Sequence, residues 1–128
     1  MTLRKYYDSA QRTSRKDMTN KDHIFNAITG LCGELGEVAD LIKKTYFQGH
    51  PLNRERIAEE LGDLLWYWAE MCAGMQLDPE EVARKNIEKL KRRYPEGFST
   101  EASLHRTPYS LEDIADANEM APAEGAEK

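Results

Sequence analysis

The chain has 128 residues, of which 40% are hydrophobic and 32% charged, and its net charge is −5. This length suits one domain with one core, and the negative charge argues against a nucleic-acid partner bound by bulk electrostatics. We expect no membrane span, since no apolar run is long enough, and no secretion signal at the first residues. Cys32 and Cys72 form no Cys-x-x-Cys motif, which favours reduced core thiols in a cytoplasmic protein.

The spacing of apolar residues predicts four helices in chain order, at about 2–16, 22–45, 54–75 and 78–93. Asn20 or Asp22 is the expected N-cap of the second helix, and Gly49 and Pro51 mark the turn after it. Asp78 followed by proline and two glutamates is typical of a helix start. Because no segment alternates as a strand does, the expected fold class is all-α.

Beyond Phe98 the composition of the chain changes. We expect residues 1–100 to form the helical domain and residues 101–128 to form a partly disordered C-terminal extension. A short helix near Ser110 and an acidic, low-complexity end are expected within this extension.

Apolar stripes with steps of three and four residues run along the second and third helices, as in helices packed at a shallow angle. The stripes are Ile24, Ile28, Leu31, Leu35, Val38 and Ile42, then Ile57, Leu61, Leu64, Trp68, Met71 and Met75. The fourth helix carries a shorter stripe at Ala83, Ile87, Leu90 and Tyr94. Short connections make neighbouring helices antiparallel, so we predict an antiparallel bundle of about four main helices.

A Glu-Leu-Gly-acid string occurs twice, and each of its acids stands one residue before a member of these stripes. Its acids are Glu34 and Glu37 in the second helix, and Glu60 and Asp63 in the third. Within each helix the two carboxylates lie one turn apart on one face. When two antiparallel helices pack with their apolar stripes facing each other, side chains at the same rotational offset from each stripe point to the same side of the pair. The two strings are also about equally far from the turn, so they lie at a similar height. The four carboxylates are therefore expected to form one site.

Acidic pairs on helices are usually solvated surface charges, with Lys or Arg one turn further on. None of these four acids is followed by Lys or Arg four residues later. Crowded carboxylates would raise one another's pKa, and a bound cation relieves this repulsion. Carboxylate oxygens suit Mg²⁺, with Mn²⁺ as a substitute, rather than Zn²⁺. A di-iron bundle would want Glu-x-x-His, which the chain lacks.

Further residues share the offset of the acids. Tyr67 lies on the acid stripe and is a better ligand candidate than Trp68, which lies on the core stripe. If the fourth helix folds back along the third, Lys89 and Arg93 lie level with the acids and can bind substrate. The alternative is that these two residues belong to a solvated basic face of the helix. Glycines within the helices favour close packing over room for a ligand, at Gly30, Gly33, Gly36 and Gly62.

GLCGELGEVADLIKK followed by EELGDLLWYWAEM resembles the signature of the MazG-like, all-α nucleoside triphosphate pyrophosphohydrolases. KNIEKLKRRYPEGF resembles the family's downstream segment, and YYDSAQRT fits its small, single-domain bacterial and phage-type branch. The resemblance covers about residues 3–100. It implies a helical bundle assembled as a homodimer or a dimer of dimers.

The resemblance also implies Mg²⁺-dependent hydrolysis of (deoxy)nucleoside triphosphates at the α–β phosphate bond, in nucleotide-pool control. The implied metal ligands and catalytic acids are Glu34, Glu37, Glu60 and Asp63. Asn86 and Lys89 match nucleotide-contacting positions, and Arg93 and Tyr67 complete our predicted substrate site. We assign Glu37 as the carboxylate that positions or deprotonates the attacking water.

Two other functions are compatible with these residues. One is phosphoribosyl-ATP pyrophosphohydrolysis, a sister chemistry that a substrate panel with pyrophosphate detection would separate. The other is a non-catalytic helical nucleotide-binding or interaction module. The absence of Mg²⁺-dependent nucleotide binding in calorimetry would favour such a module.

Overall fold

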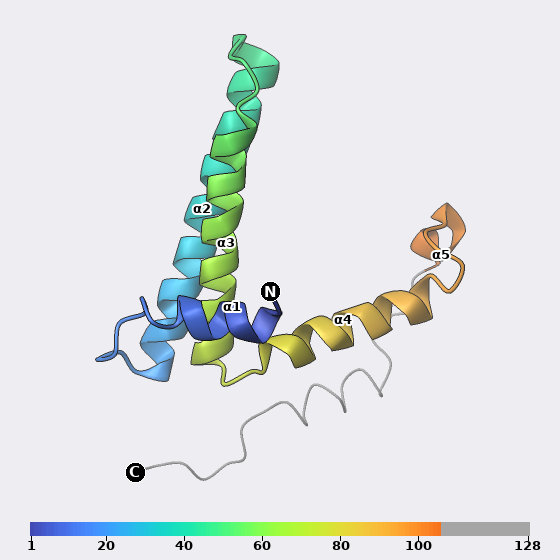
Figure 1. The fold of residues 1–128 in the computed structure, drawn as a ribbon. Helices are drawn as coiled ribbons and strands as arrows, with labels where there is room; N and C mark the ends of the chain where they lie inside the picture. Colours follow the sequence, from blue (N-terminus) through green and yellow to red (C-terminus); the bar gives the residue numbers. More distant parts are fainter. Residues whose placement is uncertain (106–128) are drawn as a thin grey trace. The chain divides into compact units, whose positions relative to one another are not determined.

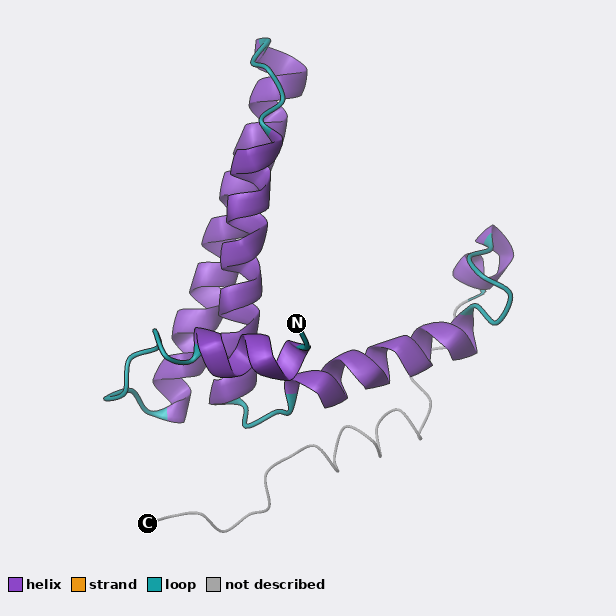
Figure 2. Cartoon of the chain, in the orientation of Figure 1, coloured by secondary structure: helices purple, strands orange, loops and turns teal. Residues whose placement is uncertain are grey.

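The computed structural model describes residues 1–105, which form five α-helices and no strand within that range. The helices are α1 Leu3–Ala10, α2 Asn20–Gln48, α3 Arg54–Gly74, α4 Pro79–Arg93 and α5 Thr100–Leu104 (Figures 1 and 2). The predicted all-α class is confirmed. Two compact units make up the chain, Met1–Pro79 and a second that begins at Glu80. No helix in the described part is both long and apolar enough to cross a membrane.

Side chains at the helix ends determine the bounds of α2 and α3. The Thr19 hydroxyl accepts a hydrogen bond from the backbone N–H of Asp22, and the Asp22 carboxylate accepts one from the N–H of Thr19. This reciprocal pair makes Thr19 the N-cap, earlier than the expected Asn20 or Asp22. Gly49 ends α2 with φ of 72°, a left-handed conformation that favours glycine, and Asn53 caps α3.

The first helix is shorter than predicted, since it ends at Ala10 and not near residue 16. The Thr13 hydroxyl donates to the carbonyl of Ala10, and the Ser14 hydroxyl donates to the carboxylate of Glu70. Short polar side chains of this kind offer the backbone an alternative to further helical turns. Residues 11–19 therefore form an irregular connection to α2.

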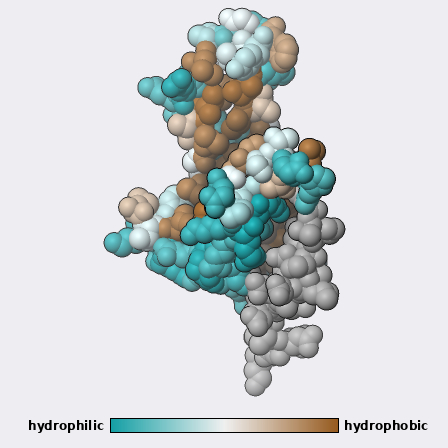
Figure 3. All heavy atoms as spheres, turned by 90° about the vertical axis from the view of Figure 1, so that its right-hand side faces the viewer, coloured by the Kyte–Doolittle hydropathy of each residue, from teal (hydrophilic) through white to brown (hydrophobic). Residues whose placement is uncertain are grey.

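The two long helices lie side by side as an antiparallel hairpin (Figure 1). Three of the six residues in the α2 stripe and four of the six in the α3 stripe are half-buried, including Leu31, Val38 and Leu64. Other members of the same stripes are exposed, and Leu35 and Leu61 are 59% and 53% exposed. One neighbouring helix covers only part of a stripe, so a hairpin leaves the remainder uncovered. Figure 3 shows hydrophobic side chains gathered along this hairpin.

The first helix packs against α3 within the first unit. Its less exposed side is formed by Leu3, Tyr6, Tyr7 and Ala10, which recur at the spacing of one helix face. Arg4 forms an ion pair with Asp78, and the Trp66 indole N–H donates to the Thr13 hydroxyl over 2.8 Å. These contacts join the first residues to the C-terminal half of α3 and to the connection that follows it.

The second unit contains α5 and all but the first residue of α4. The predicted bounds of the fourth helix agree with α4, which has acidic residues in its first turn and basic residues in its last. The short helix α5 was not predicted from the sequence; Ser99 caps it by accepting from the N–H of Ala102. The helix expected near Ser110 lies outside the described residues.

Candidate metal centre

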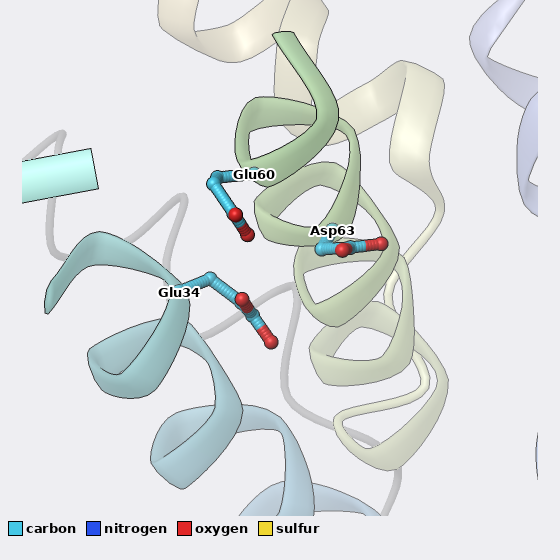
Figure 4. A group of neighbouring side chains, drawn as sticks. All are labelled: Glu34, Glu60 and Asp63. Carbon is cyan, nitrogen blue, oxygen red and sulfur yellow. The ribbon is translucent and has the colours of Figure 1, made fainter. Parts of the chain in front are cut away.

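Three of the four predicted carboxylates meet between α2 and α3. Glu34 comes from α2, and Glu60 and Asp63 come from adjacent turns of α3 (Figure 4). One carboxylate oxygen from each residue lies within 4.8 Å of the other two. We call these three residues the acidic cluster. Its convergence follows from the shared offset of the acids on two antiparallel helices.

The acidic cluster is crowded and partly shielded from water. Glu60 is buried, Glu34 is half-buried and Asp63 is exposed. Desolvation raises the pKa of Glu34, and the negative charges of Asp63 and Glu60 raise it further, as does a hydrogen bond with Glu60. The charged form of Glu34 is thus disfavoured beside its neighbours. A divalent cation would reverse this preference, so the donor set fits a metal ion with oxygen ligands.

Glu60 also has a basic neighbour that was not predicted. Arg56 Nη2 lies 3.3 Å from Glu60 Oε1, one turn earlier on α3. Compensating cations were considered only at the positions four residues after each acid. Arg56 was therefore missed, because it lies four residues before Glu60. Because the Arg56 side chain is 56% exposed, the pair is weak. It offsets one of three clustered charges and leaves the crowding of the acidic cluster largely in place.

Glu37 is exposed and lies outside the acidic cluster, although its charge contributes to the raised pKa of Glu34. Its assignment as a metal ligand and water-positioning group stays a prediction. Asp40, one turn further along α2, forms ion pairs with Lys43 and Lys44. Hydrogen bonds from these two ammonium groups lower the pKa of Asp40 to about 2. Asp40 is therefore a surface ion pair and not a ligand candidate.

The aromatic ring of Tyr67 lies directly against Gly30 on the facing helix. A Cβ atom added to Gly30 would come within 2.2 Å of Tyr67 Cε1. Tyr67 also meets Trp66 edge to face, with ring centroids 5.0 Å apart. Because Tyr67 follows Asp63 by four residues, its ring lies one turn from the acidic cluster on the same helix face. At Gly30, the packing explanation for the helix glycines is therefore correct.

Gly30→Ala is expected to destabilise the protein by about 1–3 kcal/mol, because the new methyl group must displace the Tyr67 ring. Denaturant unfolding would measure the change. Gly33→Ala is the matched control on the same helix, since a Cβ atom added there would have no described atom within 4 Å. The control should be neutral or stabilising by up to about 1 kcal/mol through helix propensity. Equal losses in the two variants would contradict the close contact.

The remaining predicted substrate residues lie on α4. Asn86 and Lys89 are exposed, and Arg93 is half-buried. They belong to the second unit, whereas the acidic cluster belongs to the first. The expectation that Lys89 and Arg93 lie at the same height as the acids stays a prediction.

Comparison with known proteins bears on both helices of the site. Residues 22–98 match the MazG nucleotide pyrophosphohydrolase domain. The chain is 33% identical over 94 residues to the gene 37 protein of Mycobacterium phage L5, covering 70% of this chain and 82% of that protein. No solved structure matches at a significant level.

More distant similarity extends to two mammalian enzymes. The chain is 28% identical over 121 residues to dCTP pyrophosphatase 1 of Homo sapiens, covering 90% of this chain and 71% of the enzyme. For dCTP pyrophosphatase 1 of Bos taurus the identity is 26% over 123 residues, with coverages of 91% and 73%. The matched family domain includes all of α3, nearly all of α2 and every residue of the acidic cluster. This chain belongs to the MazG nucleotide pyrophosphohydrolase family.

Proposed function

We propose that this protein hydrolyses (deoxy)nucleoside triphosphates at the α–β phosphate bond, giving a nucleoside monophosphate and pyrophosphate. The observation that carries the proposal is the convergence of Glu34, Glu60 and Asp63 between the two helices of the family domain. A site made of carboxylate oxygens favours Mg²⁺, and Mn²⁺ is expected to substitute for it.

The acidic cluster would hold the metal, with Glu37 one turn further along α2 as a fourth carboxylate. When bound, Mg²⁺ supplies positive charge that neutralises the triphosphate and the departing pyrophosphate. Glu37 is exposed, so it can orient a water molecule from solvent and accept its proton. In hydrolysis of this kind, the protein contributes mainly by positioning the reacting groups and stabilising the developing charge.

Candidate groups for binding the nucleotide come from α3 and α4. The Tyr67 ring, fixed against Gly30, offers a flat apolar surface one turn from Asp63. On α4, Asn86 offers an amide for polar contacts, and Lys89 and Arg93 offer positive charge for phosphate oxygens.

We further propose that a second copy of the chain covers the exposed apolar residues of the α2–α3 hairpin. We call these residues the open face: Phe25, Ile28, Leu35, Ile42, Leu61 and Leu65. Monomeric proteins rarely expose a large contiguous apolar patch, and two hairpins pressed together would form a four-helix bundle. Gly36 and Gly62 lie on the same helices with open space over them within the described chain, which permits close helix approach.

A turnover screen over canonical and modified nucleoside triphosphates, in ribose and deoxyribose forms, tests the proposed reaction. We expect monophosphate and pyrophosphate in equal amounts, with dCTP and related pyrimidine deoxynucleotides the first candidates because of the dCTP pyrophosphatase 1 relatives. Turnover should stop when the divalent metal is chelated and return with Mg²⁺ or Mn²⁺. Phosphoribosyl-ATP belongs in the panel as the competing substrate.

Two results would overturn the proposal. Release of orthophosphate in place of pyrophosphate would indicate a different bond. Failure to turn over any member of the panel, together with absent Mg²⁺-dependent nucleotide binding, would indicate a non-catalytic helical module.

A further inference from the structure

Outside the acidic cluster, the most unusual group in the first unit is the carboxylate of Glu70, which is 0% exposed. Its Oε1 accepts from the Ser14 hydroxyl over 3.0 Å and lies 2.7 Å from His23 Nδ1. Its Oε2 accepts from Gln11 Nε2 over 3.3 Å. We call these four residues the Glu70 cluster.

These partners stabilise the charged form of the buried Glu70 carboxylate. Desolvation works to raise the pKa of Glu70, but hydrogen bonds from His23, Ser14 and Gln11 outweigh it, and the pKa lies below its ordinary value. A buried carboxylate is costly unless it is fully paired, and an apolar side chain would pack there more cheaply. A satisfied polar cluster instead favours one arrangement of the segments that it joins.

The Glu70 cluster joins the beginning of the chain to the helix that carries two of the clustered acids. Gln11 and Ser14 lie in the irregular connection after α1, while Glu70 follows Asp63 by two helical turns on α3. The hydrogen bond from Trp66 to Thr13 is a second link between the same segments. We call residues 3–16 the N-terminal segment; it is held on α3 just beyond the acidic cluster.

Within this segment, α1 packs against α3. Tyr6 and Tyr7 lie on its less exposed side, which packs against α3. Burial raises the pKa of the Tyr6 hydroxyl, and the charge of Asp63 raises it further. For Tyr7, burial is again the main cause of a raised pKa, and Cys72 and Glu70 add to it. The hydrogen bond from Trp66 to Thr13 places the N-terminal segment one helical turn from Asp63 along α3.

We propose that Glu70 is a positioning residue of the nucleotide site, because its hydrogen bonds hold the N-terminal segment on α3 one helical turn from Asp63. The α2–α3 packing holds the acids themselves, so loss of Glu70 should leave them in place and remove one side of the site. The consequence is weaker substrate binding with nearly intact chemistry. This inference rests on the proposed function for its kinetic readout.

Two assays on the whole 128-residue chain test the inference. Tryptic cleavage after Arg12, Arg15 and Lys16, which are exposed, reports release of the N-terminal segment without nucleotide or metal. Steady-state kinetics, at a temperature where circular dichroism shows complete folding, reports the site. In Glu70→Ala we expect cleavage at least 10-fold faster and KM at least 10-fold higher, with kcat changed less than threefold.

Glu70→Gln tests whether hydrogen bonding, and not charge, is responsible. A glutamine can still accept from Ser14 and His23, and the Gln11 amide can turn to offer its oxygen to the new amide group. We therefore expect this variant to restore slow cleavage and a KM within threefold of wild type. Ser14→Ala removes one hydrogen bond and should give intermediate values; it also serves if Glu70→Ala does not fold.

Asp22→Ala is the matched control, because it removes a helix cap near the same segment and Asp22 makes none of the hydrogen bonds to Glu70. It should lower the Tm and leave cleavage of the segment and KM unchanged. Unchanged cleavage in Glu70→Ala, or an unchanged KM despite rapid cleavage, would overturn the inference. Inactivity of the wild-type protein across the nucleotide panel would instead overturn the proposed function, while the cleavage assay would still report on Glu70.

Discussion

Asp63→Asn is expected to lower Mg²⁺-dependent pyrophosphate release at least about 100-fold while α-helical content stays unchanged. Asparagine fits the same exposed position but removes one of three clustered charges and one of the proposed metal ligands. Glu37→Gln is expected to have an equally large effect through the attacking water. Pyrophosphate detection measures turnover, far-UV circular dichroism measures helicity, and calorimetry measures Mg²⁺ affinity.

The control for these substitutions is Asp40→Asn on α2. Asp40 is paired with Lys43 and Lys44 and should be dispensable for turnover. Near-normal turnover in Asp63→Asn would exclude the acidic cluster as the metal site. Activity in Glu37→Gln alone would restrict the site to the three acids that meet between the helices.

Leu35→Glu and Leu61→Glu are each expected to convert an oligomer into monomers. Both leucines belong to the open face, where more than half of each side chain is exposed in the single chain. A glutamate buried there against a second hairpin would lose its hydration without gaining a partner. The dissociation constant should rise at least about 100-fold, which light scattering coupled to size-exclusion chromatography can measure across a dilution series.

Leu52→Glu provides a comparable substitution in the turn between α2 and α3. Leu52 is also exposed, at 49%, but it lies off the helical stripes. This variant should keep the mass of the wild-type assembly. A wild-type protein that is monomeric at micromolar concentration would contradict the pairing of open faces.

Local patterns were sufficient to predict the helices and much of the site. The bounds of α3 follow from periodic apolar residues, and the start of α4 follows from Asp78 and Pro79; both signals depend on near neighbours in the sequence. Convergence of Glu34 with Glu60 and Asp63 follows because a short connection determines both the antiparallel direction and the relative height of two helices. These are consequences of helix geometry and need no knowledge of distant contacts.

Interactions between distant residues could not be predicted in this way. Nothing in the spacing of Glu70 distinguishes it from a solvated glutamate, because its donors lie 47 to 59 residues away. The contact of Tyr67 with Gly30 depends likewise on the exact rotation of two helices. A signal for it was present, since a glycine facing an aromatic residue across a hairpin is a candidate for close approach. Arg56 could have been predicted, because a cation four residues before an acid is as near to it as one four residues after.

The Glu70 cluster also has a consequence for the order in which the chain folds. The α2–α3 hairpin is closed by a short turn, whereas the bond from Ser14 to Glu70 closes a loop across 56 residues. Loop closure is more costly for the longer loop, so the hairpin should form first and the N-terminal segment should dock last. During synthesis the earliest residues must therefore wait, undocked, until α3 has been made. On partial unfolding the same residues should be the first to leave.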